Sequence, residues 1–394
     1  MKKLLAATAT IALTAGAGFA GEDIKLGASF GFTGPLESLA PDMMRGVELA
    51  MKEVTDSGLL LDGASVSVAQ ADSTCIDAAA AVTAAERLVT EGVKGIVGGM
   101  CSGETIATLE KVGVPNGIVM VSPSATSPAL STIDDGGFFF RTSPSDARQG
   151  EVMADIVLER GINTVAVTYT NNDYGKGLAD SFEAAFKAKG GTVTTNSAHE
   201  DGKADYAAEV AALDAAGGDA LVVVGYVDQG GSGVVRGALD AGAFDTFVFP
   251  DGMVAQSLVD RFGQELAKSF GQNPAAEGEG RDTYIALAKA AGYDGSSAFS
   301  AESYDAAALM LLAMQAAGSS DPKVYKDKVM EIANAPGEPI LPGQLAKALE
   351  LIKAGQDIDY VGATAVEFVE PGESAGTYRE VAFPNGVLEV IGYR

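Results

Sequence analysis

The chain is poor in the side chains that most often build metal and catalytic centres. Its 394 residues include no tryptophan, one histidine and two cysteines. Sites that need several His and Cys ligands are therefore excluded, and we expect neither a metal nor a cofactor. Basic residues are also scarce, since 27 Lys and Arg stand against 53 Asp and Glu, for a formal net charge of −26. This balance argues against a nucleic-acid partner, which requires a basic surface.

Hydrophobic residues, by contrast, make up 47% of the chain. This share is enough to bury a large core, so the protein is not intrinsically disordered. At roughly 150 residues per domain, the length predicts two or three domains. No segment after the N-terminus is long and apolar enough for a membrane helix, so we expect no direct membrane insertion.

The first twenty residues have the pattern of a bacterial secretory signal peptide. Lys2 and Lys3 precede a short apolar run, 4–13, and mostly small residues follow up to Ala20. The run is shorter than the ~20 residues that span a bilayer, which disfavours a membrane anchor. No cysteine follows for lipid attachment. We predict a signal peptide over 1–20, cleaved near Ala20, and export of the mature protein to the periplasm.

Export places Cys75 and Cys101 in an oxidising compartment, where an even number of cysteines predicts a disulfide. The two residues follow predicted strands at 65–71 and 95–98. If those strands are parallel neighbours, both cysteines lie at the same sheet edge within bonding distance. Such a bridge would stabilise the fold by on the order of 3 kcal/mol. The alternatives are two free thiols or a redox pair, although the spacing is not the CxxC of most redox pairs.

Short apolar runs alternate with amphipathic segments along the chain, a pattern typical of parallel sheets flanked by helices. The first series has predicted strands at 24–30, 65–71, 95–98 and 117–121, with helices at 41–54, 76–90 and 102–112. The second series has strands at 164–169, 192–198, 220–225 and 246–250, with helices at 174–189, 206–216 and 234–241. Eight strand-helix units are too many for one small sheet, so we predict two open α/β lobes. An eight-fold barrel is disfavoured by the break at Pro144 and by the helical region that follows.

From Arg281 onward the pattern changes to helices without clear strands between them, at 284–291, 303–317 and 324–333. Two strands, 378–383 and 387–393, then form a hairpin around Asn385-Gly386. If the helices pack on the first sheet and the hairpin on the second, the chain crosses between lobes three times, near 142–146, 272–275 and 375–378. The predicted lobes are therefore 21–144 plus 274–376, and 145–273 plus 377–394. Three adjacent crossings make a hinge beside a cleft.

Ligand-binding residues are expected at the carboxyl ends of the strands, where open α/β sheets bind their ligands. Ser102 follows the third strand and is the predicted N-cap of the next helix, whose free amides would attract an anion. An ordinary cap is the alternative. Ser124 and Thr126 lie in the turn after the fourth strand.

Three residues of the second lobe, Tyr174, Tyr226 and Asp251, also follow predicted strands. Taken singly, a buried tyrosine is more often a core residue, and Asp251 could cap a helix. Because both lobes contribute polar residues at equivalent edges, we expect one binding site in the cleft between them.

Several segments, each modest alone, occur together in a specific order and spacing. They are DIKLGASFGFTGPLESLAPDMMRGVELA (23–50), the pair Cys75/Cys101, GGMCSGETIA (98–107), VSPSATSPAL (121–130), NNDYGKGLADSF (171–182), GYVDQGG (225–231) and SYDAAALMLLAMQAAG (303–318). Together they resemble the type I periplasmic binding proteins, in particular the branched-chain (hydrophobic) amino acid-binding subunits of bacterial ABC transporters. The resemblance covers nearly the whole mature chain. It implies a monomeric two-lobed receptor, not an enzyme, that closes on a neutral α-amino acid and presents it to a membrane permease.

The resemblance also implies roles for individual residues. Ser102 and Thr126 would hold the ligand carboxylate, with the main-chain amides of the Ser102 and Ser124 turns. Ser124 would offer its carbonyl to the ligand ammonium, and Asp251 would pair with that ammonium.

Tyr174 and Tyr226 would be contacts from the second lobe, and Leu39 would wall the side-chain pocket. Two positions depart from the family pattern: the best-known leucine-binding members have Glu at the place of Asp251 and an aromatic residue at the place of Leu39. The segment 342–364 is similar to the longer variants of the family.

The charges of the predicted site fit a zwitterion. Asp251 is its one fixed carboxylate, and no Lys or Arg accompanies it. A ligand ammonium would complete the pair that a buried Asp251 needs, whereas a dicarboxylate would require an arginine. His199 is expected in a solvated turn without the orienting partner that catalysis requires.

Three alternatives remain open. The ligand of a receptor could be another amino-acid-like or amide solute. The receptor could be a sensor subunit that feeds a chemoreceptor instead of a permease. A nucleotide-dependent α/β enzyme using the glycine-rich turn at 98–103 is disfavoured, because neither GxGxxG nor a Walker sequence follows a strand.

Overall fold

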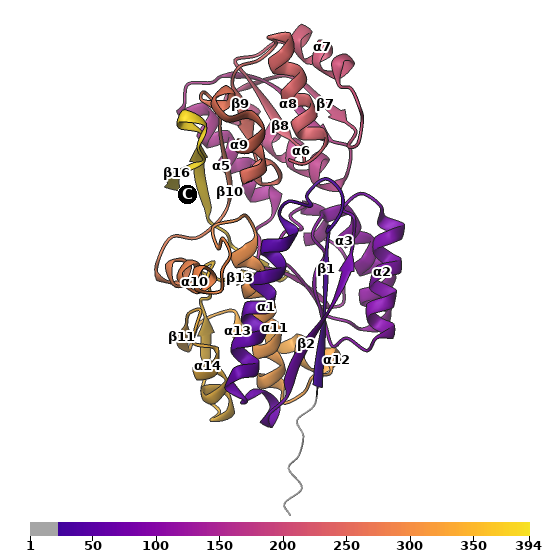
Figure 1. The fold of residues 1–394 in the computed structure, drawn as a ribbon, viewed down its shortest axis with the longest axis vertical. Helices are drawn as coiled ribbons and strands as arrows, with labels where there is room; N and C mark the ends of the chain where they lie inside the picture. Colours follow the sequence, from indigo (N-terminus) through magenta and orange to yellow (C-terminus); the bar gives the residue numbers. More distant parts are fainter. Residues whose placement is uncertain (1–22) are drawn as a thin grey trace, which may run out of the picture.

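Two lobes, each built on a seven-stranded sheet, make up the computed structural model, which describes residues 23–394 (Figure 1). The first sheet has the order β13-β14-β5-β4-β3-β1-β2. Its strands are β1 (Asp23–Phe30), β2 (Ser65–Asp72), β3 (Ile96–Gly98), β4 (Met120–Ser122), β5 (Phe139–Arg141), β13 (Phe368–Val369) and β14 (Glu373–Ser374). Adjacent strands are parallel except β13 with β14.

The second sheet has the order β16-β15-β10-β9-β8-β6-β7. Its strands are β6 (Thr164–Thr170), β7 (Thr192–His199), β8 (Ala220–Val224), β9 (Phe247–Phe249), β10 (Phe270–Pro274), β15 (Tyr378–Ala382) and β16 (Glu389–Tyr393). The strands from β7 to β10 are parallel, and the hairpin β15–β16 adds two antiparallel strands at one edge. The predicted architecture of two open parallel-sheet lobes is confirmed.

Helices flank both sheets. They are α1 (Ala40–Ser57), α2 (Ala78–Thr90), α3 (Ser102–Thr108), α4 (Val114–Asn116), α5 (Asp146–Glu159), α6 (Asp173–Ala188), α7 (Ala207–Ala216), α8 (Gly230–Ala241), α9 (Gln256–Phe262), α10 (Glu279–Ala290), α11 (Ser300–Ala317), α12 (Pro322–Tyr325), α13 (Val329–Ile332) and α14 (Leu345–Lys353). Pro41 lies in the first turn of α1, where no amide is needed, and Gly58 ends the helix with φ 64°. Beside α1 lies α11, which is buried on every side from Ser300 to Met314 (Figure 1).

The strand prediction was incomplete for the shortest elements. It missed β5, β10, β13 and β14, as well as the parallel pair β11 (Glu338–Ile340) with β12 (Ile358–Tyr360). The helices expected between 284 and 333 do follow one another without a strand between them, and the missed strands β11 to β14 lie later, within 338–374. The equally short β3, β4 and β9 were found because they lie in apolar runs, whereas β10 (FGQNP) and β11 (EPI) contain proline and polar residues and show no such run.

The chain passes between the two sheets three times. The passages lie between Arg141 and Thr164, between Pro274 and Phe368, and between Ser374 and Tyr378. Because β10 pairs with β15, two of the passages run side by side where the lobes join. The residue at which each lobe ends stays a prediction.

Cys75 and Cys101 form a disulfide, with their Cα atoms 5.2 Å apart. The prediction assumed that the strands before these cysteines are neighbours. They are not, because β1 lies between β2 and β3. The bridge instead passes over the end of β1 at Gly31, where an added Cβ would lie 2.8 Å from the Cys75 Sγ. Glycine at this position leaves room for the disulfide.

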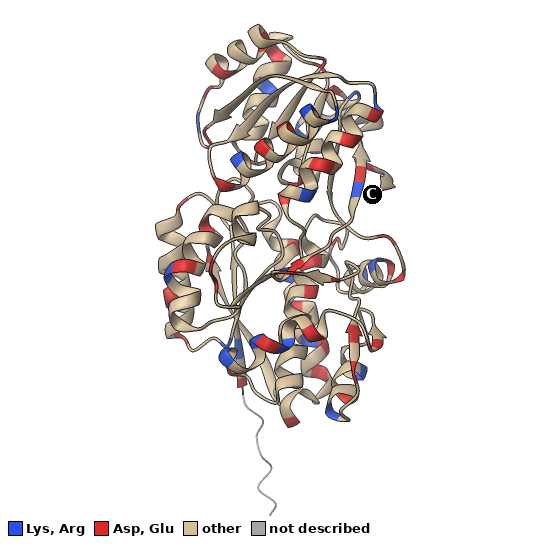
Figure 2. Ribbon diagram, turned by 180° about the vertical axis from the view of Figure 1, so that it is seen from behind, with Lys and Arg blue, Asp and Glu red and all other residues tan. Residues whose placement is uncertain are grey.

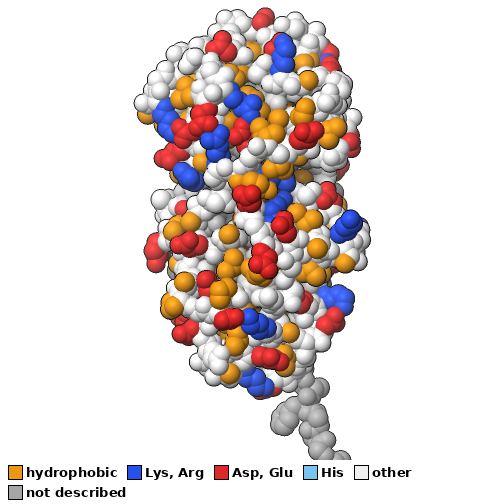
Figure 3. Space-filling view, turned by 90° about the vertical axis from the view of Figure 1, so that its left-hand side faces the viewer, with side chains coloured by type: hydrophobic (Ala, Val, Ile, Leu, Met, Phe, Trp, Pro, Cys, Tyr) orange, Lys and Arg blue, Asp and Glu red, His pale blue; other side chains and the backbone are white. Residues whose placement is uncertain are grey.

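Acidic side chains are spread over both lobes rather than gathered in one patch (Figure 2). On the face shown in Figure 3, hydrophobic side chains are likewise interspersed with charged and polar ones. Within residues 23–394, no helix has the length and apolar character that crossing a membrane requires. The predicted signal peptide, 1–20, lies outside the described residues.

Candidate functional site

A small cavity lies between the lobes, at the carboxyl edges of the two sheets. Its volume is about 10 Å³, room for about one water molecule. The residues that line it are Leu36, Met100, Cys101, Ser102, Ser124 and Phe299 from the first lobe, and Tyr174, Tyr226, Asp251 and Gly252 from the second. Five of the seven predicted binding residues therefore meet in one place.

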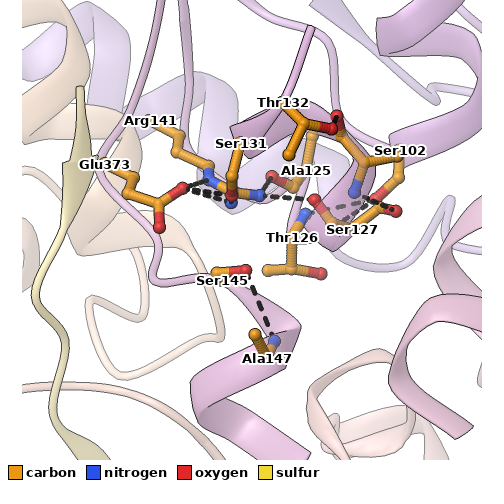
Figure 4. Close-up of polar contacts among 11 residues, drawn as sticks. Ser102, Ala125, Thr126, Ser127, Ser131, Thr132, Arg141, Ser145, Ala147 and Glu373 are labelled. Carbon is orange, nitrogen blue, oxygen red and sulfur yellow. Dashed lines mark hydrogen bonds and ion pairs between the residues drawn. The ribbon is translucent and has the colours of Figure 1, made fainter. Parts of the chain in front are cut away.

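Ser102 is the first residue of α3 rather than its cap. The N-cap position belongs to Cys101, and Glu104 completes a capping box, so the predicted cap was one residue too late. The Ser102 Oγ accepts hydrogen bonds from the amides of Thr126 at 3.2 Å and Ser127 at 3.0 Å (Figure 4). No acceptor among the described residues takes the hydroxyl hydrogen, which leaves Ser102 a donor toward the cavity.

The amides ahead of α3 are occupied by a side chain of the same turn. Glu104 Oε1 accepts from the amides of Met100 at 2.8 Å and Cys101 at 3.0 Å. Burial raises the pKa of Glu104 to about 7. These two amides are therefore not available to an anion, and the expectation of free amides at the helix start rests on those of Ser102 and Gly103.

Ser124 has the opposite hydrogen-bonding state to Ser102. Its hydroxyl donates to the Met100 carbonyl at 2.8 Å, and its amide donates to Ser122 Oγ at 3.3 Å. With its donors engaged, Ser124 presents acceptors to the cavity. A positively charged donor suits this residue, whereas an anion does not.

Asp251 is held by two donors from its own lobe. Its Oδ1 accepts from the Tyr174 hydroxyl at 2.6 Å and from the Gly252 amide at 2.8 Å. Burial raises the pKa of Asp251 above its ordinary value, and the hydrogen bond from Tyr174 opposes this rise. The Tyr174 hydrogen is thus used within the protein, and this residue positions the carboxylate.

Tyr226 stacks on Tyr174, with ring centroids 5.3 Å apart and an interplanar angle of 9°. Its hydroxyl accepts a hydrogen bond from Asn172 Nδ2 at 3.3 Å. No described residue accepts the Tyr226 hydrogen. The second lobe therefore provides one donor, Tyr226, beside one acid, Asp251.

Two of the predicted residues do not line the cavity. Leu39 is the N-cap residue of α1 and is buried in the core, and Leu36 is the leucine of this loop that reaches the cavity. The Leu39 amide donates to the Leu36 carbonyl at 3.0 Å, so the two leucines lie at opposite ends of one turn. Thr126 contributes its amide to Ser102, while its side chain lies on the side of Ser145 and Ala147 (Figure 4).

The sequence prediction missed several residues of the cavity wall. Met100 and Cys101 share the turn with Ser102, and Gly252 follows Asp251, so their positions next to predicted residues were a usable signal. Phe299 has no such signal because it precedes a helix, α11, with a left-handed backbone at φ 62°.

Hydrogen bonds join the two lobes beside the cavity. The Asp228 amide donates to the Pro35 carbonyl at 3.0 Å, and the Ser38 amide donates to the Asp228 carboxylate at 2.9 Å. The hydroxyls of Ser38 and Ser257 lie 3.2 Å apart. Pro35 and Ser38 precede α1 in the first lobe, and their partners belong to the second. The cleft is closed.

The prediction that His199 lies in a solvated turn was wrong. His199 is the last residue of β7 and is buried. Its Nδ1 lies 2.8 Å from the Thr168 hydroxyl, and burial lowers its pKa to about 4. The turn begins after the strand ends, so the strand carries the histidine into the core.

Among residues 23–394, no three His, Cys, Asp or Glu side chains are grouped as metal ligands.

Comparison with known proteins adds to this geometry. Residues 23–335 match the family model described as periplasmic binding protein. A Leu/Ile/Val-binding protein homolog 1 of Brucella abortus is 29% identical over 337 residues, covering 83% of this chain and 88% of that protein. A chemotactic signal transduction system substrate-binding protein, BasB of Halobacterium salinarum, is 29% identical over 376 residues, which cover 88% of this chain and 83% of that protein.

A solved structure shares the fold. The branched-chain amino acid transporter substrate binding protein LivJ from Streptococcus pneumoniae, in complex with isoleucine, superposes with a TM-score of 0.78 at 22% identity. The match covers 95% of this chain and 99% of that one. At this identity the likeness concerns the fold.

Proposed function

The chain belongs to the periplasmic binding protein family, and we propose on this basis that it is an exported receptor whose lobes close on an α-amino acid. Ser102, Ser124, Tyr226 and Asp251 carry the binding in this proposal, and Tyr174 positions Asp251. The protein delivers its ligand as a monomer to the permease of an ABC importer. Its signal peptide, 1–20, is removed near Ala20 on passage to the periplasm.

The separation of donors from acceptors around the cavity is the observation that supports this proposal most directly. Ser102 and Tyr226 have hydroxyl hydrogens to give, which suits a carboxylate. Ser124 and Asp251 present oxygens, which suits an ammonium. An α-amino acid carries these two charges on adjacent atoms, and its ammonium compensates the buried Asp251.

The remaining wall of the cavity is apolar. Leu36, Met100 and Phe299 line it, and no Lys or Arg does. A charged ligand side chain would lack a partner there, so the proposed ligands have neutral aliphatic side chains. The Leu/Ile/Val-binding relatives, named for such ligands, support this class.

A role in sensing is the second candidate, because the relative from Halobacterium salinarum is named for chemotactic signal transduction. Both roles use the same cleft and differ in the membrane protein that receives the closed form. Crosslinking of the ligand-loaded protein in its own cells distinguishes them, since capture of a permease supports import and capture of a chemoreceptor supports sensing.

A nucleotide-dependent enzyme is not supported by the turn at 98–103. Cys101 of this turn is part of the disulfide, and the Glu104 carboxylate occupies the amides of Met100 and Cys101, two of the donors that the turn could offer a phosphate. The side chains around the cavity include no nucleophile paired with a base.

Calorimetry with refolded, ligand-free protein tests the proposal. The titrants are leucine, isoleucine, valine, threonine and alanine, with glutamate and arginine as charged controls. We expect at least one of the five neutral amino acids to bind and to raise the melting temperature. At ~100 times the dissociation constant, the ligand contributes about 2.7 kcal/mol to stability. A protein that binds none of the five contradicts the proposal.

A further inference from the structure

Arg141, the last residue of β5, is a buried cation whose hydrogen-bond donors are all engaged. It is 1% exposed, and a guanidinium has five N–H groups. Its Nε and Nη2 donate to the Glu373 carboxylate, and Nη2 also donates to the Ser131 hydroxyl at 2.7 Å. Its Nη1 donates to the carbonyls of Ala125 and Ser127, both at 3.0 Å (Figure 4). All five donors are used within the first lobe, so Arg141 does not bind the ligand itself.

The turn 125–127 is buried, so its main-chain groups need partners within the protein. Arg141 supplies the partner for two of its three carbonyls. The amides of Thr126 and Ser127 donate to Ser102 Oγ, at 3.2 and 3.0 Å. The guanidinium and the serine therefore hold the turn from opposite sides (Figure 4).

This arrangement decides the hydrogen-bonding state of Ser102. A hydroxyl oxygen has two lone pairs, and the two amides occupy both, so only the hydroxyl hydrogen is left to interact. Because Ser102 lines the cavity, this hydrogen is available to an acceptor there. A shift of the turn would free a lone pair and let the hydroxyl accept instead of donate. The guanidinium thus acts on the cavity through the turn.

The ion pair also lies where the chain leaves the first lobe. Arg141 and Glu373 are register partners in the neighbouring strands β5 and β14, and two of the three passages between the lobes follow these strands. The pair, the turn and Ser102 all belong to the first lobe, so opening of the cleft does not require their hydrogen bonds to break. The turn is therefore ordered before a ligand arrives, which lowers the entropic cost of binding.

Another ion pair of the protein is a structural counterpart without a connection to the cavity. Glu380, on β15, accepts hydrogen bonds from Arg160 and from Arg394 at 3.1 Å, and its side chain is 8% exposed. Among the described residues, neither arginine bonds to a segment that lines the cavity. Satisfying a buried charge therefore does not by itself require contacts like those of Arg141 with the turn.

We propose that Arg141 is a positioning residue for recognition of the ligand carboxylate: together with Glu373 it fixes the turn 125–127, and the turn keeps Ser102 a hydrogen-bond donor. This inference rests on the proposed amino-acid receptor and adds a determinant of its specificity. A donor suits a carboxylate better than a carboxamide, which has no charge and whose NH2 group needs an acceptor. The wild-type protein should therefore bind an amino acid more tightly than the corresponding amino acid amide, by about tenfold or more.

The test measures this preference in Arg141→Lys by calorimetry, using refolded, ligand-free protein, the best-bound of the five neutral amino acids and its amide. Lysine keeps the positive charge, but its three donors on one nitrogen cannot hold both carbonyls together with Ser131 and Glu373. We expect the affinity for the amino acid to fall about tenfold and the affinity for the amide to fall by less than about threefold, so that the preference narrows.

Glu373→Ala provides a second variant if Arg141→Lys does not fold. It should narrow the preference in the same way, because the guanidinium loses the carboxylate that holds it. Glu373→Gln keeps an acceptor of similar size, so the preference should recover in this variant. Its melting temperature should stay below that of the wild type, because the buried guanidinium lacks its counter-charge. A merely structural role would lower the melting temperature of these variants without moving the preference.

Glu380→Ala is the matched control, because it removes the carboxylate of an ion pair that does not reach the cavity. It should lower the melting temperature and leave the preference unchanged. An unchanged preference in Arg141→Lys and in Glu373→Ala overturns the inference while the receptor proposal stands. A wild-type protein that binds none of the five amino acids overturns both.

Discussion

At the scale of single residues, hydrogen-bond direction separates side chains of one type. Ser102 and Ser124 are both serines in the cavity wall, but neighbouring amides make one a donor, and the Met100 carbonyl makes the other an acceptor. The sequence placed both residues at the cleft because they follow strands. It could not assign their hydrogen-bond states, since these depend on partners up to 25 positions away.

Tyr226→Phe should weaken amino-acid binding by about tenfold, because a hydrogen bond to a charged group contributes roughly 1.5–3 kcal/mol. The ring remains stacked on Tyr174, and the variant loses only the long hydrogen bond from Asn172, so the melting temperature of the ligand-free protein should change little. Calorimetry measures the affinity. Tyr169→Phe, outside the cavity wall, is the control, and equal affinities of the two variants would show that Tyr226 gives its hydrogen elsewhere.

Asp251→Ala should abolish amino-acid binding without unfolding the protein. The variant loses the partner of the ammonium, and it also removes a carboxyl whose burial is unfavourable in the ligand-free state. Binding and melting temperature are measured on the same sample. Retained affinity would contradict the role of Asp251, and if the protein no longer folds, Asp251→Asn, which keeps the size of the side chain, replaces this variant in the test.

At the scale of elements, length and apolar content together determined what could be predicted, since the three-residue strands β3, β4 and β9 lie in predicted apolar runs. The predicted runs around β1, β2, β6 and β7 were long enough for their pattern to emerge, whereas β13 and β14 are pairs of residues that exist because β5 offers an edge.

Glu302, on helix α11, should make the stability of the protein depend on pH. This side chain is buried, its Oε1 has no partner in the described chain, and burial raises its pKa to about 7. A carboxyl with a raised folded-state pKa stabilises the protein fully below its unfolded pKa, and this contribution is lost as pH rises through 7.

Glu302→Gln should therefore remove part of the pH dependence of stability in the ligand-free protein. Between about pH 5 and pH 8, the wild type should lose on the order of 2 kcal/mol more stability than the variant. Urea unfolding at several pH values measures this difference. The lowered pKa of His199 destabilises the fold as pH falls below about 6.5. This contribution is the same in wild type and variant, so it cancels when the variant's stability is subtracted from that of the wild type. Parallel pH profiles would contradict the pKa of Glu302.

At the scale of the whole molecule, closure is a balance between contacts across the cleft and freedom at the hinge. A cavity of about 10 Å³ has no room for an amino acid, so the lobes must separate before a ligand enters. Asp228 makes two of the hydrogen bonds between the lobes, to Pro35 through its amide and to Ser38 through its carboxylate.

Asp228→Ala should shift the ligand-free protein toward the open form and increase its radius of gyration in solution scattering. Ligand binding should restore the compact form at a higher concentration, because closure has lost a favourable contact. Asp240→Ala, on the outer surface of the same lobe, is the control. Identical scattering profiles for wild type and variant would show that this contact does not hold the lobes together.

The disulfide has a consequence for when the protein can bind its ligand tightly. Cys101 forms part of the cavity wall, and its bond to Cys75 fixes that wall over the end of β1. Newly made copies that still await export sit among reduced thiols and lack this tie. Reduced protein should therefore bind its ligand more weakly than oxidised protein, and under the proposed export this difference would limit binding of amino acids in the cytoplasm.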